Sequence, residues 1–73
     1  GLEPLRLHDP SLVQAFIAAL RDRKPEVRMT AVDVVSRIDD PAARDAIRRL
    51  NKREYSRNVR RALALAMKRL GEK

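Results

Sequence analysis

The sequence predicts an all-α fold, a short solenoid fragment made of two stacked antiparallel helix hairpins. Two observations carry this prediction. Apolar residues recur with the i, i+3, i+4, i+7 spacing of an amphipathic helix along most of the 73 residues. The apolar pattern of the first half then returns in the second half, about 30 residues later. Because one helix hairpin cannot bury its apolar side alone, the two copies are expected to share a core.

The first hairpin is predicted to pair a helix over residues 10–22 with a helix over residues 25–38. Proline opens both helices, at Pro10 and Pro25, where its missing N–H costs no helical hydrogen bond. Asp9 comes directly before the first helix, where its carboxylate can accept the free N–H groups of the first turn. The predicted apolar faces are Val13, Phe16, Ile17 and Leu20, then Val27, Ala31, Val34, Val35 and Ile38.

The second hairpin is predicted from helices over residues 41–51 and 57–70. The dipeptide Asp40-Pro41 repeats the start signal of the first hairpin. Ser56 is the expected N-cap of the last helix, and Gly71 is its expected C-terminal stop. The predicted apolar faces are Ala43, Ala46, Ile47 and Leu50, then Val59, Leu63, Ala66, Met67 and Leu70.

The two hairpins align as repeats. A shift of about 30 residues places the first helix on the third, and a slightly longer shift places the second on the fourth. The longer shift brings Val27 and Arg28 onto Val59 and Arg60. The difference between the shifts falls in a turn, where insertions are tolerated. We therefore expect two repeats, at residues 9–39 and 40–71. Residues 1–8 are expected to be an irregular lead-in or the end of a preceding repeat, and residues 72–73 are expected to be a tail.

A hairpin that opens with Asp-Pro and carries a Val-Arg-x-x-Ala or Val-Arg-x-x-Leu step early in its second helix resembles the HEAT repeats. It is most similar to the short bacterial form, often called PBS-lyase HEAT-like, and the similarity covers about residues 9–71. The resemblance implies a right-handed superhelix whose second helices line a concave recognition surface. The residues that carry the resemblance are Asp22, Val27, Arg28, Ala31 and Ile38, then Glu54, Val59, Arg60, Leu63 and Leu70.

The resemblance also implies a structural polar ladder between the repeats. In this family an acidic residue in the turn and an arginine early in the second helix lie six positions apart and stack from repeat to repeat. Asp22 and Arg28 keep this spacing in the first copy. Glu54 and Arg60 keep it in the second copy, with the longer acid in place of aspartate.

The residues on which most enzymes depend are missing. His8 is the single histidine, cysteine is absent, and glycine occurs only at Gly1 and Gly71. The sequence therefore holds no metal-spaced cluster, thiol nucleophile or glycine-rich phosphate loop. No serine or threonine has a histidine or lysine evidently placed to activate it. We expect a chain that is not an enzyme and has no cofactor, metal or small-molecule ligand.

The basic charge is confined to the second half. The chain carries 17 Lys and Arg against 10 Asp and Glu, a net charge of +7. Residues 1–39 hold six side chains of each sign, whereas residues 40–73 hold eleven basic and four acidic side chains. Because the planar guanidinium suits bidentate contact with carboxylate or phosphate, this half is a candidate surface for an anionic partner.

The candidate partner-binding residues combine this charge with outward apolar side chains. On the last helix, Leu65 lies beside basic residues that point away from the core side. On the second helix, Met29 holds an outward position together with Asp33 and Ser36. Tyr55 lies among the cations of the preceding turn, where it could stack on a base. The candidates are Met29, Arg53, Tyr55, Arg57, Arg61, Leu65 and Lys68.

We predict a cytoplasmic protein–protein interaction scaffold, a fragment of a larger protein, whose partner has an acidic surface. Two alternatives stay open: binding of a nucleic-acid phosphate backbone through the second repeat, and a purely structural terminal repeat whose charge keeps it soluble. Two observations favour the interpretation that the chain is a fragment. Stacks of this kind need about three repeats for stability, and the sequence starts at Gly1 instead of Met. A membrane partner is not expected, because the longest apolar runs span six residues against the ~20 that a membrane helix needs.

Overall fold

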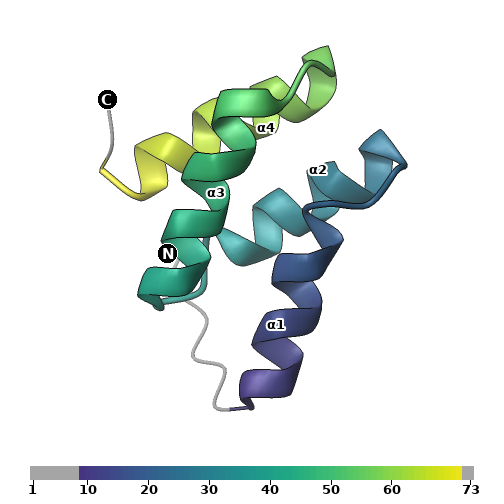
Figure 1. Ribbon diagram of the computed structural model, residues 1–73. Helices are drawn as coiled ribbons and strands as arrows, with labels where there is room; N and C mark the ends of the chain where they lie inside the picture. Colours follow the sequence, from purple (N-terminus) through teal and green to yellow (C-terminus); the bar gives the residue numbers. More distant parts are fainter. Residues whose placement is uncertain (1–8, 72–73) are drawn as a thin grey trace.

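Figure 1 shows the four helices of the computed structural model, which describes residues 9–71. The helices are α1 (Pro10–Ala19), α2 (Pro25–Val35), α3 (Pro41–Arg53) and α4 (Arg57–Arg69). α1 and α3 run in the same general direction, and so do α2 and α4 (Figure 1). The predicted all-α arrangement of two stacked helix hairpins is therefore confirmed. The expected lead-in at residues 1–8 and the tail at 72–73 lie outside the described residues.

The predicted helix starts are confirmed, with one difference at α4. Asp9 Oδ1 accepts a hydrogen bond from Ser11 N–H at 2.9 Å, and Asp40 Oδ1 accepts one from Ala42 N–H at 2.7 Å. Ser56 occupies the N-cap of α4, but its side chain makes no capping hydrogen bond. Its own N–H donates instead to the carboxylate of Glu54 at 2.9 Å, so the preceding acid organises this helix start.

Helices α1 and α2 end earlier than predicted because their last turns tighten. After Ala19 the hydrogen bonds span three residues, as in Asp22 N–H to Ala19 O at 3.1 Å. The same happens after Val35, where Ile38 N–H donates to Val35 O at 3.1 Å. At the other end of the chain Gly71 has a φ of 74°, and its N–H donates to Lys68 O, which confirms it as the stop of α4.

The core lies between the four helices and is aliphatic. α2 and α4 share the most extensive interface. Smaller interfaces join α1 to α2 and α3 to α4, so each hairpin also packs on itself. The largest side chains that are fully buried are Leu20, Val32, Val35, Ile47, Leu50, Val59 and Leu63.

The expectation that Ser36 faces outward is wrong, since Ser36 is buried with 6 % of its surface exposed. Ser36 is the C-cap of α2 and keeps helical φ and ψ of −64° and −15°, so its burial comes from the side chain of Arg69 that covers it from α4. Its hydroxyl oxygen accepts a hydrogen bond from Arg69 Nη1 at 3.0 Å. The same Nη1 atom lies 2.9 Å from Asp33 Oδ1, so the end of α4 covers the end of α2.

Candidate functional site

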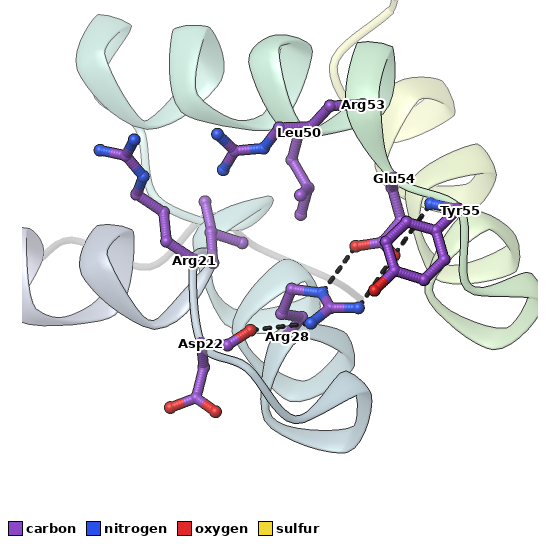
Figure 2. Close-up of a pocket in the computed structure, with 8 residues that line it drawn as sticks. Arg21, Asp22, Arg28, Leu50, Arg53, Glu54 and Tyr55 are labelled. Atoms are coloured by element: carbon purple, nitrogen blue, oxygen red, sulfur yellow. Dashed lines mark hydrogen bonds and ion pairs between the residues drawn. The ribbon is translucent and has the colours of Figure 1, made fainter.

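The turns of the two hairpins meet at a buried ion pair between Arg28 and Glu54 (Figure 2). Arg28 Nε donates to Glu54 Oε1 at 2.7 Å, and Arg28 Nη2 donates to Glu54 Oε2 at 3.0 Å. Only 9 % of the Arg28 side chain and 1 % of the Glu54 side chain are exposed. Because the guanidinium fork meets both carboxylate oxygens, the contact fixes distance and orientation together. It joins the first turn of α2 to the residue that follows α3.

Both partners of this ion pair also hold the backbone of the turns. Arg28 Nη1 donates to the carbonyl oxygens of Asp22 at 2.8 Å and Arg23 at 3.1 Å. Glu54 Oε2 accepts hydrogen bonds from the N–H groups of Tyr55 at 3.1 Å and Ser56 at 2.9 Å. The pair is thus a structural junction whose hydrogen-bonding groups are engaged within the chain.

In both hairpins, an arginine early in the second helix donates a hydrogen bond to the backbone of the preceding turn. Arg60 Nη1 donates to the carbonyl oxygen of Glu54 at 3.0 Å, as Arg28 Nη1 does to the carbonyl oxygen of Asp22. The carboxylates differ. Asp22 Oδ1 accepts the N–H of Lys24 at 2.9 Å and forms no ion pair with an arginine of the described residues. Of the four expected ladder residues, the structure joins Arg28 and Glu54 through their side chains, and the other contacts run through backbone carbonyls.

The junction shifts the titration of its two members. The hydrogen bond from Arg28 lowers the pKa of Glu54 below its ordinary value of 4.5. The hydrogen bonds from the N–H groups of Ser56 and Tyr55 lower the pKa as well, whereas burial of the carboxylate opposes the shift. The same side-chain hydrogen bond raises the pKa of Arg28. Both groups are therefore charged at neutral pH.

Glu54 is expected to make the stability of the chain depend on pH in acid. Because its pKa is lower in the folded state, its contribution is complete above the unfolded value of 4.5 and is lost as the pH falls through the folded value. Urea unfolding midpoints of the parent and of Glu54→Gln, measured at neutral pH and at steps below 4.5, check this. The gap between the two midpoints should shrink as the pH falls, and a constant gap would contradict the prediction.

The candidate partner-binding residues are all exposed, but they lie in two groups. Arg53 and Tyr55 line a cavity of about 230 Å³ beside the ion pair. There the guanidinium carbon of Arg28 lies 6.0 Å from the centroid of the Tyr55 ring, and Tyr55 itself is 87 % exposed. The second group lies on the exposed sides of α2 and α4 and consists of Met29, Arg57, Arg61, Leu65 and Lys68.

The α4 members of the second group follow one stripe of the helix. Their spacing of four, four and three residues keeps them on one side, from Arg57 to Lys68. Leu65 is 55 % exposed within this stripe. Met29, which is 38 % exposed, occupies the position on α2 that corresponds to Arg61 on α4. We call Met29 and these four α4 residues the α2–α4 surface.

Sequence reasoning missed Arg21 as a site residue. Arg21 lies in the turn after α1 and lines two cavities, both of which Arg53 also lines. The signal was available in the sequence. The shift that aligns α2 with α4 also places Arg21 on Arg53 and Asp22 on Glu54.

A further groove of about 370 Å³ is apolar and lies along α1 and α2. Its lining includes Val27, Ala31 and Val34 of α2. The residues at the corresponding positions of α4 are all buried in the core: Val59, Leu63 and Ala66. Among the described residues, the groove is therefore the open counterpart of a face that is buried in the core on α4.

One of the comparisons with known proteins, the scan against family models, agrees with this architecture. Among the residues that the structure describes, no helix combines the length and the apolar character needed to cross a bilayer. No curated protein and no solved structure shows significant similarity to the chain. The family model for HEAT repeats matches residues 1–72. HEAT repeats are generally non-catalytic scaffold elements that mediate protein interactions. Since the match spans nearly the whole sequence, the chain belongs to the HEAT-repeat family.

Proposed function

We propose that the chain is a non-catalytic interaction module that binds a protein with an acidic surface through the α2–α4 surface. The observation that carries the proposal is the composition of this surface. Exposed Leu65 lies between basic side chains on α4. No acidic side chain of the described residues forms an ion pair with Arg57, Arg61 or Lys68. The α2–α4 surface thus presents an apolar side chain next to positive charges that have no acidic partner among the described residues. Such a surface complements a partner surface that is both apolar and acidic.

The proposal includes a division into repeats at residues 9–39 and 40–71, and a place for the chain within a larger cytoplasmic protein. The apolar groove on the first hairpin supports the larger stack, because its counterpart in the second hairpin is buried.

Nucleic-acid binding is the second candidate. The exposed ring of Tyr55 favours it, since an aromatic side chain near basic residues can stack on a base.

Reversal of charge on α4 is expected to weaken the binding of an acidic polypeptide without unfolding the chain. The variant carries Arg57→Glu, Arg61→Glu and Lys68→Glu, and the probe is poly-glutamate. With about 1 kcal/mol from each exposed charge pair, affinity should fall about 100-fold. A matched control changes the same number of charges away from α4: Arg23→Glu, Lys24→Glu and Lys52→Glu, all at exposed positions.

The same variants separate the alternatives when duplex DNA, single-stranded DNA and RNA replace the polypeptide at two salt concentrations. Contact with three phosphates would give a log–log salt slope of about 3. Nucleic-acid binding with that slope, lost in the α4 variant, would replace the protein-binding proposal. If the parent binds neither polypeptide nor nucleic acid at low salt, the charge is only solubilising and the repeat is structural.

A further inference from the structure

We propose that Arg21 and Arg53 form a site for one anionic group of a polypeptide, either a phosphoryl group on a serine or threonine or the carboxylate of an acidic side chain. The site lies at the turns of the hairpins, apart from the α2–α4 surface. It deepens the proposed function, on which it rests, because it names the group that the protein partner would present.

The first support is the placement of the two arginines. They hold the same position in the two hairpins, directly before the acids Asp22 and Glu54. Stacking of the hairpins brings both onto the lining of the same two cavities, of about 230 and 390 Å³. Figure 2 shows the side chain of Arg53 extending above Leu50 toward the side on which Arg21 lies. Two guanidinium groups are thus presented to one space.

The second support is that no acid of the described residues forms an ion pair with either arginine. The charge of Glu54 is matched by Arg28. Asp45, which lines the larger cavity, is paired with Arg49 at 3.0 Å. Asp22 accepts the N–H of Lys24, and its carboxylate points away from the arginines in Figure 2. Because none of these acids forms an ion pair with Arg21 or Arg53, both guanidinium groups can pair with an added anion.

The floor of the site strengthens such a contact. Leu20 and Leu50 line the smaller cavity and are 1 % and 2 % exposed. An apolar floor keeps water from one side of the bound group, which raises the strength of charge-assisted hydrogen bonds. Two planar guanidinium forks offer enough donors for the oxygens of one phosphoryl or carboxylate group.

The surroundings favour a single group on a polypeptide over a nucleic-acid backbone. Asp22 lines the smaller cavity and Asp45 lines the larger one. A continuous row of phosphates along both cavities would pass two acidic residues, whereas one anionic group needs contact only with the two arginines.

The test uses the whole chain and a short alanine–glycine peptide that carries phosphoserine, glutamate or serine at one position. The phosphoserine or the glutamate peptide, or both, should bind and shift the Arg21 and Arg53 Nε–Hε NMR signals, and the serine peptide should not. The double variant Arg21→Gln, Arg53→Gln should lower that affinity about tenfold or more. The control Arg23→Gln, Lys52→Gln removes the same charge from exposed neighbouring positions and should leave the affinity unchanged.

The outcomes separate this site from the α2–α4 surface. The α4 charge-reversal variant should bind the peptide with the parent's affinity, even though its affinity for poly-glutamate is lower. The relative affinities of the phosphoserine and glutamate peptides identify which anionic group the site prefers. Failure of both peptides to bind, an equal loss in the control, or equal competition by a single-stranded DNA of the same charge would overturn the proposal. Unchanged circular dichroism of both variants shows that the fold is retained.

Discussion

Replacing Glu54 by alanine is expected to lower the free energy of unfolding by about 3 kcal/mol. The change removes the carboxylate that pairs with Arg28, and Arg28 is buried with only 8 % of its surface exposed. A buried positive charge is then left without a partner. It also removes the acceptor for the N–H groups of Tyr55 and Ser56. Urea unfolding followed by circular dichroism measures the loss. Since small domains are stable by only about 5 to 15 kcal/mol, the effect should be plain in the unfolding midpoint.

A matched control for this prediction is Asp45→Ala. Asp45 forms an ion pair with Arg49 at 3.0 Å, but the two side chains are 52 % and 78 % exposed. Exposed pairs of this kind contribute about 0 to 1 kcal/mol. If Glu54→Ala costs no more than Asp45→Ala, the junction between the turns is not a major source of stability. Glu54→Gln, which keeps one acceptor oxygen, should fall between the two.

The helices and their starts could be predicted from local sequence because their causes are local. Asp9 and Asp40 reach N–H groups two residues away, and the apolar spacing needs only the geometry of one helix. The ends of α1 and α2 were less predictable. Arg21 and Asp22 continue the helical pattern, yet the chain tightens at Ala19 to enter the turn.

The contacts of the candidate site could not be predicted in full, because they form between stacked hairpins. The spacing of residues along the sequence does not describe how the hairpins stack. The resemblance placed Arg28 and Glu54 in one ladder, but the separation of six residues associates Arg28 with Asp22. In the structure Asp22 offers Arg28 its carbonyl oxygen, and the carboxylate comes from Glu54, 26 residues away. Arg69 likewise reaches Asp33 and Ser36 from the neighbouring helix. Contacts between hairpins follow from how the repeats pack, so they become visible only when the hairpins are placed together.

Replacing Leu63 by alanine is expected to cost about 3 kcal/mol, because Leu63 is completely buried in α4 and its removal leaves a cavity. In a domain of this size the melting temperature should fall by roughly 12 to 24 °C. The matched control is Leu65→Ala, the same change two residues along the same helix, where the side chain is 55 % exposed. Leu65→Ala should change stability by less than about 1 kcal/mol.

The two leucines also separate the roles of the two sides of α4. Leu65→Ala should weaken binding at the α2–α4 surface while the melting temperature stays near that of the parent. Leu63→Ala should lower the melting temperature, and at temperatures where it remains folded it should bind with the parent's affinity, because its side chain does not reach the surface. Equal losses of stability in the two variants would mean that the face of α4 assigned to the core is wrong, and the assignment of the opposite face to a partner would lose its basis.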